Sequence, residues 1–365
     1  MKIKRIFLAK NAVKNKRARE IMERFAPAKV LEVDDVLATN EYLEKFQDPW
    51  AEGKQSLFLC KFPGRFLEPC PCTREYLNCG YFNISPVVGC PIDCSYCILQ
   101  GYLTAFPVQV YVNLEDLFSE LENYQKKRPR SRLRLGTGEL ADSLALEPEL
   151  GYAKALIEYF REKPNFIFEL KTKADGIGLF KELKASERIV ISWSVNPEEA
   201  AALEEKISAD MDSRLESAAT LANAGWPVGF HFDPILDFVP EEKYLALIDK
   251  VFEMVPSRRI AFISLGMLRF PPSLAPVLKD RHPQSRILCG ELFPGRDGKL
   301  RYLRPFREKL YRTLIRRIRK HGDRTLIYLC MEPGWLWEKL LGDSPALIKK
   351  ELALPLSGRI RFRPE

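Results

Sequence analysis

Short apolar stretches at regular intervals, most of them followed by a helical pattern, constrain the fold of this chain more than any other feature. The strand-like stretches span residues 81–88, 132–135, 165–172, 188–195, 227–232 and 259–265. The helical patterns span residues 114–126, 149–162, 176–183, 213–224 and 241–255. Strands that alternate with helices predict parallel βα units. A closed barrel of such units has eight, so these six predict a partial (β/α)6 TIM-type barrel.

The regions on either side of the barrel have different patterns. Residues 1–80 contain a strand at 3–8, a basic helix at 14–25 and a strand at 29–33, followed by a Pro- and Cys-rich linker. They predict a small N-terminal α/β subdomain. The barrel is expected to occupy residues 81–270. Residues 271–365 are expected to form a basic C-terminal extension with a hairpin and helices.

Composition excludes several classes of protein. The chain has 365 residues, 46% hydrophobic and 29% charged, which is typical of a globular protein and not of a disordered one. Its apolar runs fall short of the roughly 18 residues that a membrane span needs. The basic N-terminus lacks the features of a signal peptide. We therefore expect no membrane partner and a cytoplasmic location, while the net charge of +8 permits a polyanionic partner.

The strongest chemical motif is a CxxxCxxC loop formed by Cys90, Cys94 and Cys97, directly after the first barrel strand. Three thiolates on one loop can hold three irons of a [4Fe–4S] cluster and leave the fourth iron open. A zinc site would need a fourth protein ligand, and no histidine is near. We therefore predict a [4Fe–4S] cluster here. Four more cysteines precede the loop, either as a second metal site or as buried thiols: Cys60, Cys70, Cys72 and Cys79.

This loop, with Tyr96 before its last cysteine, resembles the motif of the radical S-adenosylmethionine superfamily. The resemblance implies that S-adenosylmethionine binds the open iron and yields a 5′-deoxyadenosyl radical after one-electron reduction. Gly136, Gly138 and Glu139 resemble the element that holds the amino group of this cofactor. Glycines allow close backbone approach, and a carboxylate accepts from an ammonium. The other cofactor-binding residues that we predict lie at or after strand ends: Asp142, Lys173, Ser194 and Asn196.

A narrower resemblance, over about residues 81–311, is to the spore photoproduct lyase family of light-independent DNA repair enzymes. It rests on residues 97–103, on Asp142 with the residues after it, on Lys173, and on the turn at 224–230. It implies a radical lyase that cleaves thymine dimers in damaged DNA, and a flavodoxin- or ferredoxin-type reductant. The alternative is a radical enzyme that acts on an RNA base, a peptide or a small molecule.

Two positions depart from the family pattern. Typical members carry a hydrogen-returning cysteine just upstream of the Asp142 position, where this chain has Leu140, and a tyrosine after the third loop cysteine, where it has Ile98. We therefore assign Tyr96 as a catalytic residue. The other candidates for the hydrogen donor are Cys60, Cys70, Cys72 and Cys79.

Residues 297–307 interleave cations with aromatic residues, and the Asp-Gly pair at 297–298 is a hairpin signal. A basic hairpin with aromatic residues can contact phosphates and stack on an exposed base. We predict that Arg301, Tyr302 and Arg304 contact DNA. The basic helix that follows is by itself more typical of an amphipathic helix with a solvated basic face.

Overall fold

The computed structural model describes residues 2–73 and 75–359 and places the predicted barrel strands in one eight-stranded sheet. The run predicted at 81–88 is the exception, because it is split: Tyr81–Ile84 belong to this sheet and Val87–Val88 to a second one. The strand order is β18-β14-β13-β11-β10-β9-β5-β4. The strands are β4 (Leu67–Pro69), β5 (Tyr81–Ile84), β9 (Leu133–Gly136), β10 (Phe166–Thr172), β11 (Ile189–Ser194), β13 (Val228–Ile235), β14 (Ile260–Met267) and β18 (Ile327–Leu329).

Every neighbouring pair from β5 to β18 is parallel, and β4 adds an antiparallel edge next to β5. Strand β11 is buried at every residue, as expected for a parallel sheet covered on both faces. The predicted partial barrel is thus confirmed. The sequence did not reveal β18, a three-residue strand of the C-terminal region, because so short a run shows no clear period.

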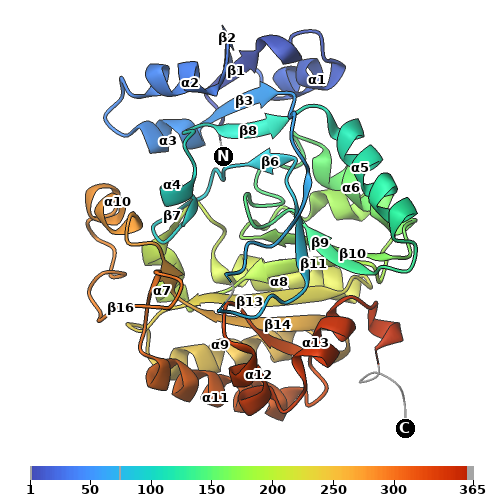
Figure 1. Ribbon diagram of the computed structural model, residues 1–365, viewed down its shortest axis with the longest axis vertical. Helices are drawn as coiled ribbons and strands as arrows, with labels where there is room; N and C mark the ends of the chain where they lie inside the picture. The colour runs from blue at the N-terminus through green and yellow to red at the C-terminus, as the bar shows by residue number, and fades with distance from the viewer. Residues whose placement is uncertain (1, 74, 360–365) are drawn as a thin grey trace.

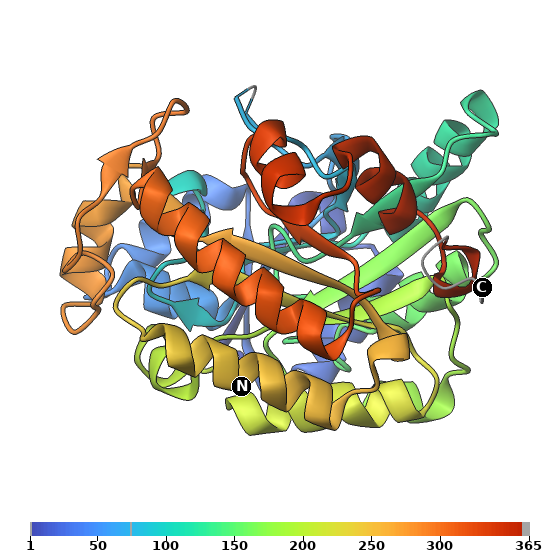
Figure 2. The same cartoon turned by 90° about the horizontal axis from the view of Figure 1, so that it is seen from below.

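Helices cover the outer face of this sheet. Figure 2 shows α8, α9 and α11 side by side along it. The segment predicted as a helix at 176–183 is instead a short 3-10 turn, η2 (Gly178–Glu182). The covering helices are α5 (Leu114–Lys127), α6 (Tyr152–Arg161), α8 (Met211–Asn223), α9 (Glu241–Met254) and α11 (Arg304–His321).

A second sheet, with the order β2-β1-β3-β8-β6, lies at the top of Figure 1. The predicted boundary after residue 80 does not separate the two sheets, because β8 and β6 come from beyond it and pair with β3 and with each other. The strands are β1 (Arg5–Ala9), β2 (Lys29–Val33), β3 (Ser56–Cys60), β6 (Val87–Val88) and β8 (Val108–Tyr111), and the helices beside them are α1 (Lys16–Arg24), α2 (Val36–Leu43) and α3 (Pro49–Lys54).

Shorter elements complete the molecule. The predicted hairpin is present as the strands β16 and β17, with β15 paired to β17. The elements are β7 (Asp93–Cys94), α4 (Leu99–Tyr102), α7 (Glu198–Glu204), β12 (Glu205–Lys206), β15 (Arg269–Phe270), α10 (Leu274–Arg281), β16 (Phe293–Pro294), β17 (Leu300–Arg301), α12 (Gly334–Leu341) and α13 (Pro345–Leu352), with 3-10 turns η1 (Lys10–Ala12), η3 (Ser257–Arg259) and η4 (Leu356–Gly358).

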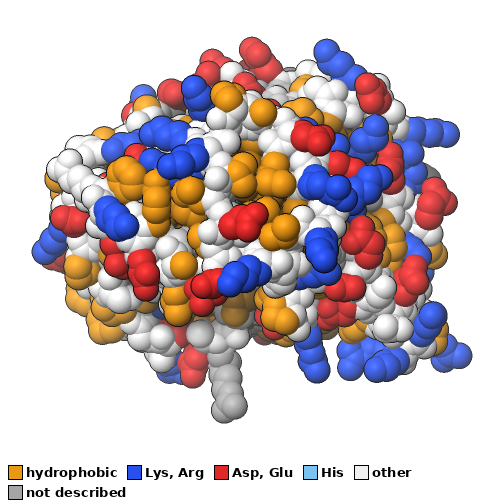
Figure 3. Space-filling model, turned by 90° about the horizontal axis from the view of Figure 1, so that it is seen from above, with side chains coloured by type: hydrophobic (Ala, Val, Ile, Leu, Met, Phe, Trp, Pro, Cys, Tyr) orange, Lys and Arg blue, Asp and Glu red, His pale blue; other side chains and the backbone are white. Residues whose placement is uncertain are grey.

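The surface bears on possible partners. None of the helices in the described part of the chain is long and apolar enough to cross a membrane. On the face seen in Figure 3, Lys and Arg side chains are interspersed with Asp, Glu and apolar side chains. The positive charge of that face is thus divided into small groups.

Candidate active site

A cavity of about 380 Å³ opens where the parallel strands of the barrel end. This volume lies within the range of small-molecule and cofactor sites, roughly 300–1,000 Å³. The carboxyl ends of parallel strands are also where barrel enzymes carry their chemistry. The polar and sulfur-containing side chains of its lining include Cys70, Cys90, Cys94, Tyr96, Cys97, Glu139, Asp142, Lys171, Lys173, Ser194, Asp233, Arg269, Lys299 and Cys330.

All three cysteines of the CxxxCxxC loop line this cavity. Burial raises the pKa of the Cys90 thiol to about 12 and that of Cys94 well above its usual value. Metal ligands must be thiolates, so metal binding here would release protons. The donor set fits a cubane cluster, whose irons take one thiolate each.

In the described residues, no three His, Cys, Asp or Glu side chains are arranged to hold a single metal ion. A cubane cluster does not require such an arrangement, because its ligands bind separate irons. The finding gives no support to a second metal site among Cys60, Cys70, Cys72 and Cys79.

The back of the loop is held by side chains and by a short strand pair. The Gln100 amide donates to the carbonyl of Cys94 over 3.1 Å. The backbone of Ser95 donates to the carbonyl of Glu204 over 2.8 Å, and β7 pairs with β12. The loop is thus fixed in place by its neighbours.

Tyr96 lines the cavity, but its hydroxyl donates to the buried carboxylate of Glu205. Burial would raise the pKa of Glu205, but Lys173 and Arg214 outweigh it and hold that pKa at about 2. Arg214 lies 2.7 Å from the Glu205 carboxylate. The Asn196 amide donates to the same carboxylate over 3.2 Å. Glu205 therefore positions two predicted site residues, Tyr96 and Asn196. Sequence reasoning missed it because it lies on no predicted strand end.

The two glycines serve packing. A Cβ at Gly136 would lie 2.2 Å from the Tyr81 hydroxyl, and one at Gly138 would lie 2.4 Å from the Cβ of Lys171. Gly138 lines the cavity, whereas Gly136 ends strand β9. The structure thus shows Gly136 as a close-packing position between strands.

Glu139 and Lys171 form an ion pair of 2.6 Å at the cavity wall. Burial would raise the pKa of Glu139, but the Lys171 ammonium outweighs it and lowers that pKa. Glu139 is therefore ionised at neutral pH, as a ligand for an ammonium must be.

Asp142 ties two strand ends together. One carboxylate oxygen accepts from the backbone of Leu144 and Ala145, each over 2.9 Å, and from the Thr172 hydroxyl over 2.7 Å. The other accepts from the backbone of Lys173 over 2.7 Å. Asp142 thus holds the loop after β9 against the end of β10, so it positions Lys173.

The remaining cofactor candidates divide into two groups. Lys173 and Ser194 line the cavity. Asn196 is 1% exposed and accepts a hydrogen bond from Tyr244, so its amide is used inside the protein. The Lys173 ammonium is 3.8 Å from Glu205, which is beyond hydrogen-bond distance and leaves its donors available.

The hairpin residues are placed differently from the prediction. Arg301 is 3% exposed and bonds to Asp297 over 2.6 Å and to the Met331 carbonyl over 3.1 Å. Tyr302 is also 3% exposed, and its hydroxyl accepts from the Asp237 backbone over 3.2 Å. Neither side chain is free to meet DNA as predicted, because neighbouring residues bury both. Arg304 is exposed.

Lys299, from the same hairpin, lines the cavity. Burial lowers its pKa, and the neighbouring cations Arg269 and Arg301 lower it further. An anion at this wall would relieve that repulsion. The interleaved motif thus contained a cavity cation, at a different position from those predicted.

Two thiols outside the CxxxCxxC loop also line the cavity, Cys70 and Cys330. Cys70 is one of the four candidates for the hydrogen donor. Cys330 directly follows β18, and its sulfur is 3.1 Å from the Arg269 guanidinium, which forms a two-pronged pair with Asp233. Sequence reasoning missed Cys330 because it missed β18.

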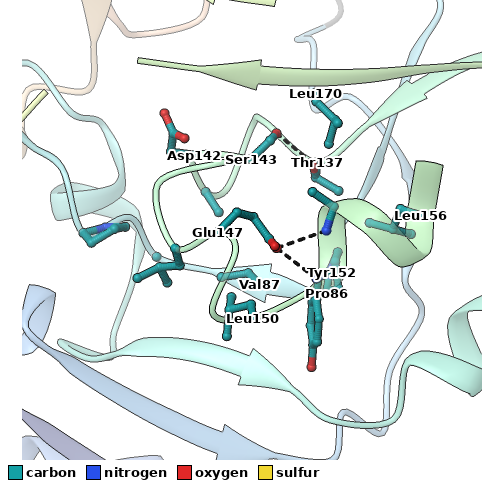
Figure 4. Close-up of a pocket in the computed structure, with 15 residues that line it drawn as sticks. Pro86, Val87, Thr137, Asp142, Ser143, Glu147, Leu150, Tyr152, Leu156 and Leu170 are labelled. Carbon is teal, nitrogen blue, oxygen red and sulfur yellow. Dashed lines mark hydrogen bonds between the residues drawn. The ribbon is translucent and has the colours of Figure 1, made fainter. Parts of the chain in front are cut away.

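A much smaller cavity, of about 30 Å³, lies behind the loop after β9. Figure 4 shows Thr137 and Ser143 joined across it by a 2.7 Å hydrogen bond, and the Glu147 carboxylate against the start of α6. Its size suits water at most. This space is therefore a small gap in the packing behind the loop and not a ligand site.

Comparison with known proteins places these features in a family. The family model described as "Spore photoproduct lyase" matches residues 79–316, which is more than half of the chain. The spore photoproduct lyase of Bacillus subtilis (strain 168) is 25% identical over 214 residues, which are 58% of this chain and 63% of that protein. The Clostridium acetobutylicum enzyme is 26% identical over 183 residues, covering 50% of this chain and 54% of the relative. The alignments thus span less than two thirds of these curated relatives.

Solved structures agree in fold. A spore photoproduct lyase complexed with dinucleoside spore photoproduct superposes with a TM-score of 0.77 at 19% identity, covering 90% of this chain and 98% of that one. A spore photoproduct lyase mutant with bound AdoMet and dinucleoside spore photoproduct gives the same score, identity and coverage. From the family match and this shared fold, the chain belongs to the spore photoproduct lyase family.

Proposed function

We propose that this protein is a radical S-adenosylmethionine enzyme that repairs thymine dimers in DNA. One observation carries the proposal: the three loop thiols and the polar strand ends face a single cavity of about 380 Å³. Membership of the family supports it, and so do the ligands named for the solved structures of its members. The cytoplasmic location, the reductant and the division into three regions remain predictions.

The cofactors would occupy the side of the cavity formed by the loop. Cys90, Cys94 and Cys97 would hold a [4Fe–4S] cluster, and S-adenosylmethionine would supply a 5′-deoxyadenosyl radical after one-electron reduction. Lys173, whose ammonium has donors available, is suited to a carboxylate. Glu139 is suited to an ammonium, in competition with Lys171.

The substrate would occupy the part of the cavity lined by Lys299. Lys299 faces the cavity beside other cations, which suits a DNA phosphate. A lesion must leave the duplex stack to reach a buried site. We assign Lys299 of the hairpin and the exposed Arg304 at the start of α11, in place of Arg301 and Tyr302, as the phosphate contacts.

Hydrogen return would use a cavity thiol in place of the cysteine that is missing at Leu140. Cys330 and Cys70 are the two thiols available in the lining apart from the loop cysteines. Burial raises the pKa of Cys330 well above its usual value, so its sulfur keeps its hydrogen at neutral pH. In the transfer, a carbon radical of the substrate gains a C–H bond, the S–H bond breaks, and the unpaired electron remains on sulfur.

The test is anaerobic reconstitution with iron and sulfide, reduction with dithionite, and incubation with S-adenosylmethionine and ultraviolet-irradiated DNA. Repair predicts both 5′-deoxyadenosine and restored thymine. One alternative is a radical enzyme that acts on a different substrate. The presence of Leu140 where typical family members have a cysteine favours it. Protein that cleaves the cofactor, releases no thymine and shows no affinity for DNA at low salt would favour that alternative. RNA bases, peptides and small molecules would then be tested as substrates.

A further inference from the structure

A buried lysine of the N-terminal region, residues 2–60, contacts the CxxxCxxC loop. Lys54, the last residue of α3, is 6% exposed and lies outside the residues that match the family model. Its ammonium donates to the carbonyl of Cys90 over 3.1 Å and to that of Ile92 over 2.9 Å. It also lies 3.6 Å from the Asp93 carboxylate, in the same loop. One cation thus contacts three positions of the loop.

The position of this lysine is fixed by packing. A Cβ at Gly53 would lie 2.3 Å from the carbonyl oxygen of Phe106, so the end of α3 lies directly against that backbone. Trp50 packs edge-on against the Phe106 ring, with 5.1 Å between ring centroids. Lys54 therefore has little freedom to withdraw from the loop.

The other end of α3 is tied to the same loop. Asp48, which caps α3, binds Arg281 of α10 over 3.0 Å. Arg281 in turn lies 3.2 Å from Asp93. A buried charge is tolerated when it is paired and hydrogen-bonded, and both cations meet this condition by contacting the loop.

We propose that Lys54 is a positioning residue that holds the CxxxCxxC loop and raises the reduction potential of the cluster bound there. The inference rests on the proposed function. A fixed positive charge in a poorly screened interior favours the state with the additional electron. The negative charge of Asp93 lowers this reduction potential. The N-terminal region is then part of the redox site.

The test is an EPR-monitored redox titration of full-length protein reconstituted with iron and sulfide, without S-adenosylmethionine. At a fixed potential, Lys54→Met should hold about tenfold less reduced cluster relative to oxidised, a shift of about 59 mV toward negative values for one electron. Asp93→Asn should shift the midpoint toward positive values. Lys54→Arg, which keeps the charge, should stay near the wild type.

Lys4→Met is the matched control, because Lys4 lies in the same region with a side chain 46% exposed. Equal midpoints for Lys54→Met and Lys4→Met would overturn the inference. If Lys54→Met assembles no cluster, Asp93→Asn decides: a positive shift supports the inference, and no shift or a negative one overturns it. Wild-type protein without a cluster would overturn the proposed function as well, whereas an unchanged Lys54→Met midpoint would overturn this inference alone.

Discussion

Glu205 organises one side of the cavity at the scale of single residues. It accepts from Tyr96 and Asn196 and pairs with Arg214, and its side chain has no exposed surface. A buried pair of this kind is costly to break, since the remaining partner is left as an uncompensated charge.

Glu205→Gln should therefore lower the free energy of unfolding by about 3–5 kcal/mol. Urea denaturation of the unreconstituted protein measures this loss. Asp212→Asn, which removes an exposed pair with Lys250, should cost at most about 1 kcal/mol and serves as the control. Equal losses in the two variants would mean that Glu205 does not organise the site.

Cys330 is the residue on which the proposed hydrogen return depends. Cys330→Ser keeps the size of the side chain but replaces a good hydrogen donor with a poor one. We expect restored thymine to fall by roughly tenfold or more, about 1.4 kcal/mol in barrier height, while 5′-deoxyadenosine still forms.

Cys289→Ser, at an exposed cysteine, should leave thymine release unchanged. If Cys330→Ser repairs normally and Cys70→Ser does not, the donor is Cys70. Normal repair by both variants would contradict the use of a cavity thiol.

At the scale of elements, the start of α6 depends on the half-buried carboxylate of Glu147. Glu147 accepts from the backbone of Gly151, Tyr152 and Ala153 over 2.9–3.0 Å, as Figure 4 shows in part. Burial outweighs these bonds and raises the pKa of Glu147 to about 7.

A carboxyl whose pKa is raised by folding stabilises the protein below its unfolded pKa, near 4.5, and loses this contribution as pH rises through 7. The wild type should therefore lose up to about 3 kcal/mol between about pH 4.5 and 8 relative to Glu147→Gln. Denaturation at several pH values measures the difference. A difference that does not vary with pH would contradict the raised pKa.

The hairpin β16–β17 gives a second prediction at this scale. Lys299→Ala should weaken DNA binding and reduce the salt dependence of the binding constant by about one unit, because one phosphate contact is lost. Tyr302→Phe should leave DNA affinity unchanged and lower stability by about 1 kcal/mol, because it loses one backbone hydrogen bond. Filter binding over a salt series checks both variants. Lower DNA affinity in Tyr302→Phe, with Lys299→Ala unchanged, would instead make the Tyr302 hydroxyl a DNA contact.

At the scale of the whole molecule, the barrel was predictable because apolar runs recur between helical patterns along the chain. Residues 189–194, for example, are buried throughout, and such a run has few alternatives to a central strand. The cysteine loop was predictable because ligand spacing is local. The full set of strands in the two sheets was not predictable. The three-residue strand β18 and the two-residue strand β6 are too short to show a pattern and depend on tertiary contacts.

The same reason separates the site residues that were found from those that were missed. Lys173 and Ser194 lie at the ends of long strands, so their placement at the cavity follows from the sequence. The burial of Arg301 does not, because it depends on Asp297 and on the carbonyl of Met331. Lys54 is separated from Cys90, which it contacts, by 36 residues, and no local pattern connects them.

Iron content together with cofactor cleavage tests whether Cys90, Cys94 and Cys97 hold a [4Fe–4S] cluster. Wild-type protein reconstituted under anaerobic conditions should hold about four irons per chain and, after reduction, form 5′-deoxyadenosine from S-adenosylmethionine. The variant with Cys90, Cys94 and Cys97 all replaced by Ala should lose both. A triple variant that keeps an intact cluster and still cleaves the cofactor would show that these cysteines are not its ligands.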